Sequence, residues 1–269
     1  MKHPISDVSR RTVSRTIAGA ALAGLAGCLG GSGATQLGSQ DQFSSVGVEG
    51  TKLVVELAEG AEVEQINLIK PNGELFGQRT VAAGAEQVSF KLRTSYTPGE
   101  YRIIGLKNDE SLTEITTEIR PEIQIHDVGL FRNHPDKAWE EAYGSSPTNT
   151  KKNGEAFVTV QNTGTGPGTA VELRFSGDVP NPIENPRGNG MNKTDSVVIQ
   201  AGETVDLFSD SFPFGSEIGG MGCTLQGNSG QFTVELETQT TDQLVTKTFD
   251  VEYSGSEEVY DCEITIGEV

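Results

Sequence analysis

The stretch Tyr96-Thr97-Pro98-Gly99-Glu100-Tyr101-Arg102-Ile103 joins a turn to a run in which apolar and polar residues alternate. Proline fixes φ and glycine tolerates positive φ, so Pro98-Gly99 is a turn signal. Alternation with period two is typical of a strand that buries one face. The same alternation recurs on both sides of this stretch, at Leu53, Val55, Leu57, Ile66, Leu68, Val88, Phe90, Leu92, Ile115 and Ile119. Short strands separated by turns predict a β-sandwich, and we expect one over residues 46–120.

A second set of short strands follows in residues 121–269. Its apolar positions alternate again, at Ile123, Ile125, Val171, Leu173, Phe175, Val205 and Leu207 and through 157–161, 232–236, 249–253 and 264–266. We therefore predict an all-β protein with two tandem β-sandwich domains. Residues 176–195 are rich in Pro, Asn and Gly, which predicts a long irregular loop.

One helical turn is expected, over residues 136–143. Lys137 and Glu141 stand four positions apart there, which is the spacing of an ion pair on a helix. Trp139 and Tyr143 belong to the same turn, and we expect them to cover the junction between the two domains.

Two parts of the chain resemble known domains. Residues 96–101 resemble the turn and following strand of immunoglobulin-like and fibronectin-type modules. Val160-Gln161-Asn162-Thr163-Gly164-Thr165-Gly166-Pro167 and Ala201-Gly202-Glu203-Thr204-Val205 resemble the adhesion-related immunoglobulin-like modules of archaeal surface proteins. The resemblance implies immunoglobulin-like sandwiches. Asn and Gly in these motifs would permit positive φ in a hairpin or corner.

Residues 1–27 have the three parts of an export signal. A basic head contains Lys2, Arg10, Arg11 and Arg15, residues 17–25 are uncharged, and small residues precede Cys28. The uncharged run is shorter than the roughly 20 residues that a helix needs to cross a hydrocarbon core, so we expect no permanent transmembrane helix.

Two motifs in this segment resemble known targeting signals. Ser9-Arg10-Arg11 and Val13 resemble the core of a twin-arginine translocation signal, although Ser14 departs from it, and Leu25-Ala26-Gly27-Cys28 resembles a lipoprotein box. The resemblance implies export by the twin-arginine route and a lipid on Cys28. That lipid would anchor the mature protein at the extracellular face of the cell membrane.

Residues 28–45 consist mainly of Gly, Ser, Gln and Thr. This composition predicts a flexible tether whose ends lie about 20 to 25 Å apart on average. The domains are therefore expected to work close to the membrane.

The chain has 38 acidic and 20 basic residues, a net charge of −18 that becomes −21 once residues 1–27 are removed. Such a charge repels phosphates and excludes a nucleic-acid partner. Asp and Glu are scattered singly through the alternating segments, which indicates an acidic folded surface. Acid-rich, lysine-poor chains of this kind resemble proteins of salt-loving archaea. The resemblance implies a fold adapted to multimolar salt, where charges are screened beyond about 3 Å.

Three cysteines are present. With Cys28 assigned to the lipid, Cys223 and Cys262 remain as an even pair, and outside the cell we expect a disulfide. The alternative, a pair of metal thiolates, lacks further ligands at short spacing.

Imidazoles and carboxylates gather in one place, at His126, Asp127, His134 and Asp136. A metal site there is disfavoured because His126 and Asp127 are neighbours on an expected strand and point to opposite faces. Asp206, Asp210 and Glu217 are a second candidate, for weak calcium or magnesium association, because hard cations prefer oxygen ligands. Neither set matches a known spacing, so no specific metal site and no cofactor are predicted.

Catalytic motifs are absent from the sequence: there is no phosphate-binding loop, no Gly-x-Ser-x-Gly and no His-Glu-x-x-His. Acidic pairs such as Glu140-Glu141 and Glu257-Glu258 follow from the overall charge and carry no signal. We therefore expect a surface binding or interaction module for an unknown protein or glycan, not an enzyme. The alternatives are an accessory or substrate-capture subunit of a membrane complex and a surface hydrolase that uses His126 or His134.

Asn192-Lys193-Thr194 is a sequon for surface glycosylation.

Overall fold

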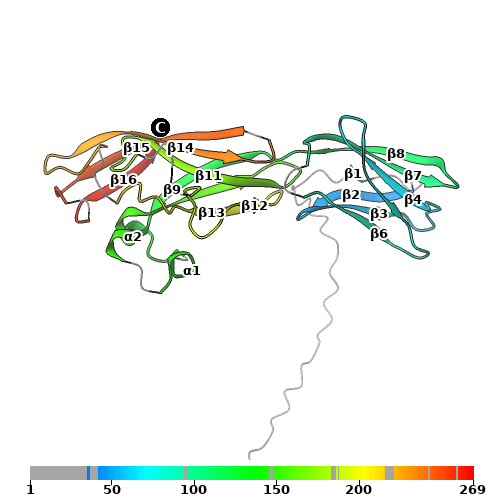
Figure 1. Ribbon diagram of the computed structural model, residues 1–269, viewed down its shortest axis with the longest axis horizontal. Coiled ribbons are helices and arrows are strands. Elements are labelled where there is room, and N and C mark those ends of the chain that lie inside the picture. The colour runs from blue at the N-terminus through cyan, green and yellow to red at the C-terminus, as the bar shows by residue number, and fades with distance from the viewer. Residues whose placement is uncertain are drawn as a thin grey trace, which may run out of the picture. The chain divides into compact units, whose positions relative to one another are not determined.

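The structure is a computed structural model, and it describes residues 35–36, 42–93, 96–137, 139–145, 148–182, 186, 188–215, 221–241, 243–258 and 260–269. Arg10, Arg11 and Cys28, the residues of the export and lipid signals, lie outside the described residues. Antiparallel strands dominate the described part of the chain, which confirms the all-β prediction (Figure 1). Within these ranges no helix is both long and apolar enough to span a membrane.

The first sandwich consists of two four-stranded sheets. One has the spatial order β1-β2-β3-β6 and the other β5-β4-β7-β8. The strands are β1 (Thr35–Gln36), β2 (Phe43–Glu49), β3 (Lys52–Leu57), β4 (Gln65–Ile69), β5 (Leu75–Thr80), β6 (Gln87–Lys91), β7 (Gly99–Lys107) and β8 (Glu110–Ile119). Their inward residues form one continuous core, in which Leu53, Ile66 and Tyr101 are fully buried.

The stretch that predicts this sandwich forms the turn into β7. Tyr101 donates a hydrogen bond from Oη to the carbonyl oxygen of Thr97, 2.8 Å away, which is the tyrosine corner of immunoglobulin-like sandwiches. Gly99 has φ +142°, and a Cβ there would lie 2.8 Å from Cγ of Pro71. Glycine is required at this position for both reasons, and the predicted hairpin is confirmed.

The second sandwich repeats this spatial order. Its three-stranded sheet has the order β13-β10-β9 and its five-stranded sheet β12-β11-β14-β15-β16, so β16 is an addition at the edge of β15. The strands are β9 (Ile123–Leu130), β10 (Ala156–Asn162), β11 (Gly168–Gly177), β12 (Val197–Ile199), β13 (Thr204–Phe208), β14 (Asn228–Thr238), β15 (Gln243–Ser254) and β16 (Glu263–Glu268). Between β9 and β10 lie a 3-10 helix, η1 (Phe131–Asn133), and two short helices, α1 (Trp139–Tyr143) and α2 (Asn149–Gly154).

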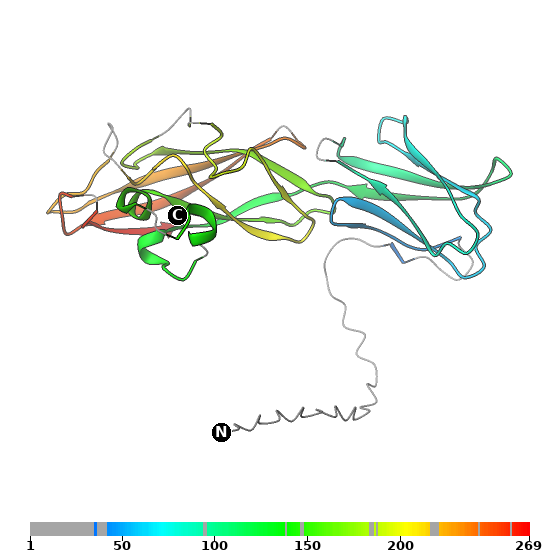
Figure 2. The same ribbon diagram turned by 60° about the horizontal axis from the view of Figure 1, so that its bottom comes forward.

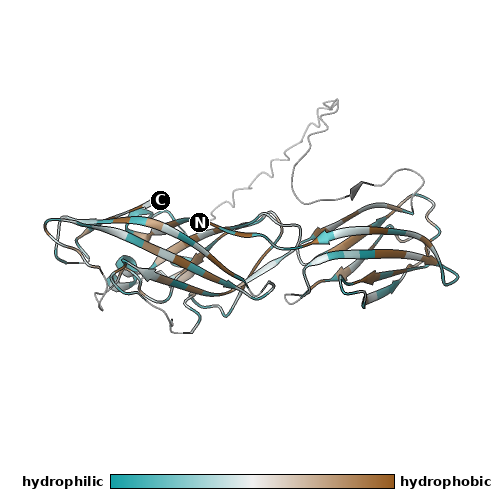
Figure 3. Cartoon of the chain, turned by 90° about the horizontal axis from the view of Figure 1, so that it is seen from above, coloured by the Kyte–Doolittle hydropathy of each residue, from teal (hydrophilic) through white to brown (hydrophobic). Residues whose placement is uncertain are grey.

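The core of the second sandwich is rich in phenylalanine. Phe175, Phe232 and Phe249 stack across three neighbouring strands, with ring centroids 6.4 and 5.6 Å apart, and Phe214 packs edge-on against Phe232. Hydrophobic and hydrophilic residues alternate along the strands (Figure 3). This alternation is what the period-two pattern of the sequence predicts.

The Asn162 motif is held by hydrogen bonds rather than by positive φ. Asn162 is buried, and its Nδ2 donates to the carbonyl oxygens of Gly166 (2.8 Å) and Ile199 (2.9 Å). A Cβ on Gly164 would lie 2.3 Å from the carbonyl oxygen of Arg120, so this glycine permits a close approach. No residue from 162 to 168 has positive φ, whereas Gly202 of the second motif has φ +78°.

Cys223 and Cys262 form a disulfide across 39 positions of sequence, as predicted. Arg132 and Asn133 of η1 reach the strand that follows Cys262. Arg132 Nη1 donates to the carbonyl oxygen of Cys262 (2.6 Å), and Asn133 Nδ2 donates to that of Ile264 (2.9 Å). The C-terminal strand β16 is therefore fixed by a covalent bond and by two side chains of η1.

Two local expectations differ from the structure. β1 and the start of β2 lie within residues 28–45, which the composition assigned to the tether, and Phe43 buries its side chain there. The expected helical turn over 136–143 is shorter, and α2 was not predicted. Lys137 precedes α1, and its ammonium pairs with Asp206 instead of Glu141.

Candidate interaction site and its buried carboxylate

The segment between β9 and β10, residues 131–155, is an insertion that carries η1, α1 and α2. Both views of the ribbon place α1 and α2 on one side of the second sandwich (Figures 1 and 2). An immunoglobulin-like sandwich needs only a short turn between these two strands. This insertion is therefore the candidate functional site.

An aromatic cluster joins the insertion to the sheet beneath it. Trp139 is 2% exposed, and its ring centroid lies 4.5 Å from that of Phe131, 5.3 Å from that of Phe208 and 6.0 Å from that of Phe157. Phe157 and Phe208 are outside the main core, although their strand neighbours Val158 and Leu207 belong to it. The three-stranded sheet thus buries both faces, one in the sandwich and one under the insertion.

Gly129 of β9 makes room for this cluster. A Cβ at this position would lie 2.2 Å from the ring of Phe157. His134 packs edge-on against the same ring, with centroids 5.2 Å apart, and Trp139 Nε1 donates to the carbonyl oxygen of His134 (2.8 Å). Trp139 and Tyr143 therefore cover the outer face of the three-stranded sheet, and the expectation that they cover a domain junction was wrong.

The metal candidates at His126 and His134 are not brought together. His134 packs on Phe157, and Asp127 accepts a hydrogen bond from the backbone nitrogen of Val128 (2.8 Å). Among the described residues, no group of three or more His, Cys, Asp or Glu side chains is placed to hold a metal ion.

In the second cation candidate, the carboxylates of Asp206 and Asp210 pair with lysine ammonium groups. Lys137 Nζ lies 2.8 Å from Asp206 Oδ2 and 4.4 Å above the ring of Phe157. Lys151 Nζ lies 3.0 Å from Asp210 Oδ1. Glu217 is outside the described residues. Asp206 and Asp210 thus have protein countercharges and serve to attach the insertion to β13 and the residues after it.

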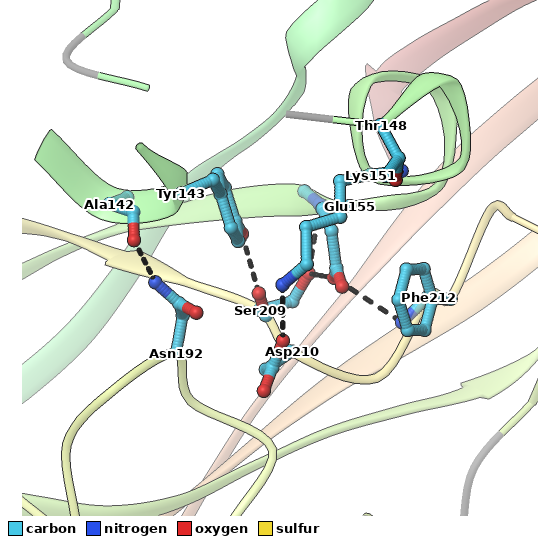
Figure 4. A network of polar contacts seen from close by, with 10 residues as sticks. Ala142, Tyr143, Thr148, Lys151, Glu155, Asn192, Ser209, Asp210 and Phe212 are labelled. Atoms are coloured by element: carbon cyan, nitrogen blue, oxygen red, sulfur yellow. Dashed lines mark hydrogen bonds and ion pairs between the residues drawn. The ribbon is translucent and has the colours of Figure 1, made fainter. Parts of the chain in front are cut away.

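Glu155 follows α2 and is the least expected residue of the site. Its side chain is fully buried, and Oε2 accepts hydrogen bonds from Ser209 Oγ and from the backbone nitrogen of Phe212 (3.2 Å) (Figure 4). Ser209 also accepts a bond at Oγ from the nitrogen of Ala156 (2.9 Å), and its carbonyl oxygen accepts one from Tyr143 Oη. This network connects α1, α2, β10 and the segment after β13.

The other oxygen of Glu155, Oε1, has no hydrogen-bond partner among the described residues. Burial raises the pKa of Glu155 from 4.5 to about 7, against the opposing hydrogen bonds from Ser209 and Phe212. Burial also raises the pKa of Tyr143, and the neighbouring Glu155 raises it further. A carboxyl group in such a place is charged or neutral according to pH within the physiological range.

Two surface hollows flank α1. One, of about 410 Å³, is lined by Phe131, Pro135, Lys137, Trp139, Glu140, Glu141, Ser145 and Lys152. The other, of about 210 Å³, lies beside Met191 and Asn192 and is walled by Leu207 and Phe208. Asn192 is half-buried there, and its Nδ2 donates to the carbonyl oxygen of Ala142 in α1. The sequon asparagine thus contributes to holding α1 in place.

Sequence reasoning missed Glu155, Ser209 and the aromatic cluster. A signal for the cluster was present: Phe157 precedes the inward Val158, and Phe208 follows the inward Leu207. In a strand, neighbours point to opposite faces, so each of these phenylalanines has to point outward. Two large outward aromatics on one sheet predict that something covers that face.

Comparisons with known proteins give no family. No protein-family model matches the chain, and no curated protein matches it. Among solved structures, a β-glucuronidase from glycoside hydrolase family 2 aligns at 14% identity with a TM-score of 0.25, over 83% of this chain and 20% of that one. A family 2 member from Bacteroides cellulosilyticus DSM 14838 aligns at 13% identity with a TM-score of 0.21, over 74% of this chain and 24% of that one. The chain spans less than a quarter of the length of these enzymes, and TM-scores this low support no conclusion about function.

Proposed function

We propose that this chain is an exported, lipid-anchored cell-surface module that binds a protein or glycan through the insertion. The observation that carries the proposal is the pairing of its cysteines. Cys223 and Cys262 are joined, which leaves the third cysteine of the sequence, Cys28, for the lipid that we propose. It stands at the position where the lipoprotein-box resemblance requires a cysteine. A structural disulfide also favours an oxidising compartment outside the cell.

The insertion is the part of the second domain best suited to a binding role. The aromatic rings packed around buried Trp139 fix α1 on the three-stranded sheet. The two surface hollows described above lie next to α1. The net charge favours partners that are not polyanions. An accessory subunit of a membrane complex would use the same surface and differ only in having a stoichiometric membrane partner.

Membrane fractionation tests the anchor. We expect wild-type protein in the detergent phase of a phase partition, and Cys28→Ser protein in the aqueous phase. The double substitution Arg10→Lys with Arg11→Lys is expected to leave the protein inside the cell, whereas Arg15→Lys, outside the pair, leaves export intact. Unmodified Cys28 in exported wild-type protein would refute the anchor.

Site-specific photo-crosslinking tests the binding surface. A photoreactive residue at Glu140, which is exposed on α1, is compared with one at Glu252, which is exposed on β15. Adducts on intact cells are expected from position 140 and not from position 252. Equal adducts at both positions, or none at position 140, would contradict a role for the insertion. Loss of a hydrolytic activity in a His126→Ala, His134→Ala double variant would instead favour the hydrolase alternative.

A further inference from the structure

Residues 209–215, which we call the loop, are held against the insertion by several hydrogen bonds. Glu155 Oε2 accepts from Ser209 Oγ and from the backbone nitrogen of Phe212. Asn181 Nδ2 donates to the carbonyl oxygens of Ser211 (3.0 Å) and Phe212 (3.2 Å). The loop therefore lies between α2 on one side and Asn181, which follows β11, on the other.

Phe212, at the centre of the loop, has φ +53°. A bulky residue adopts this left-handed conformation at a cost, and keeps it only where its surroundings hold it there. Close packing of α2 against the end of the loop helps to keep Phe212 in this conformation. A Cβ on Gly154 would lie 2.5 Å from the Cα of Gly215, so the two backbones are in contact. The conformation of the loop thus depends on its contacts with Glu155 and α2.

The charged form of Glu155 is poorly accommodated in this arrangement. Oε1 is buried without a hydrogen-bond donor among the described residues. Each neighbouring element contributes one titratable group: Tyr143 from α1, Lys151 from α2 and Asp210 from the loop. Lys151 is bonded to Asp210, which carries a negative charge of its own, so the nearest cation does not serve Glu155 alone.

We propose that residues 210–212 of the loop form a pH-dependent latch, closed over Glu155 while that carboxyl group is protonated and opened when it loses its proton. Phe214, fully buried in the hydrophobic core, stays in place and holds the end of the loop. Opening lets water reach the carboxylate, which relieves the cost of a buried, unpaired charge. It also breaks the bond from Tyr143 Oη to the carbonyl oxygen of Ser209 and the pair between Lys151 and Asp210, so α1 and α2 lose contacts with the sandwich. The latch therefore controls how firmly the insertion is held.

The pH range of the latch follows from the two states of Glu155. In the open state the carboxyl group is exposed to water and keeps the ordinary pKa of 4.5, whereas burial in the closed state raises its pKa to about 7. The closed state binds the proton more tightly, so raising the pH from 4.5 to 7 favours opening. With these two pKa values the opening equilibrium rises about fortyfold between pH 5 and pH 7 and changes little above pH 8.

Hydrogen exchange of the Phe212 amide tests the latch, because this amide donates to Glu155 in the closed state. At constant ionic strength we expect its protection factor to fall about fortyfold from pH 5 to pH 7. Glu155→Gln keeps the shape of the neutral side chain and should give a protection factor that does not change with pH. Glu140→Gln, an exposed carboxyl of the same insertion, should behave as wild type. The amide of Leu236 in β14 serves as an internal reference.

A protection factor that stays constant in wild type, or that still falls in Glu155→Gln, would overturn the proposal. If Glu155→Gln does not fold, a carbon-13 NMR titration of wild-type glutamate carboxyl groups decides instead. Glu155 should then titrate at a pH of about 7, and a midpoint at the ordinary glutamate value of 4.5 would overturn the latch.

Discussion

Removing the Cys223–Cys262 disulfide should destabilise the second sandwich by several kcal/mol. The two cysteines stand 39 positions apart, and closing a loop of that length lowers the chain entropy of the unfolded state by an amount worth about 4 kcal/mol. Arg132 and Asn133 also hold β16 through backbone carbonyl oxygens, so the native strand should stay in place without the covalent bond. We therefore expect the full entropic effect, with little change in the folded structure.

The measurement uses the single tryptophan of the chain. Trp139 is buried in the second domain, so its fluorescence during urea unfolding reports on that domain alone. Cys28→Ser protein, which carries no lipid, serves as the reference, and the test variant adds Cys223→Ser and Cys262→Ser. We expect a free energy of unfolding lower by about 4 kcal/mol in the test variant. A difference below about 1 kcal/mol would refute the argument from loop closure.

Three further predictions concern single contacts. Wild-type unfolding free energy should fall between pH 4.5 and pH 8, because the closed folded state binds the Glu155 proton more tightly than the unfolded state does. The fall is at most about 3 kcal/mol, since opening of the latch relieves part of it, and pH-dependent urea titrations should show Glu155→Gln without this fall. Gly129→Ala should cost about 1 to 3 kcal/mol by forcing Phe157 away, as measured by Trp139 fluorescence, while Gly267→Ala, with open space around it, should be near neutral. Tyr101→Phe should cost about 1 kcal/mol in the first sandwich, as measured by circular dichroism, and an unchanged midpoint would contradict a stabilising tyrosine corner.

The sandwiches could be predicted because their strands bury one face against a core. Leu53, Ile66 and Tyr101 stand at alternating positions, and each is fully buried. The disulfide could be predicted because an even pair of cysteines in a chain with an expected export signal is typical of a disulfide. These features depend on local pattern and composition, both of which are written in the sequence.

The candidate site could not be predicted in the same way. Glu155 and Ser209 are far apart in the chain, and in a protein with 38 acidic residues one more glutamate carries no signal. Helix α2 is only six residues long, and its position depends on packing against the loop. Lys137 illustrates the same limit, since its partner is Asp206 on β13 and not the glutamate at helical spacing.

The hydrogen bonds from η1 to the carbonyl oxygens of Cys262 and Ile264 affect how the edge strand β16 could pair with another molecule. The outermost strand of an open sheet offers unpaired backbone groups to which a strand of another molecule can attach. In β16 and the residue before it, the carbonyl oxygens of Cys262 and Ile264 are already engaged by Arg132 and Asn133. We therefore expect that copies of this chain do not extend one another's sheets through these two carbonyl oxygens.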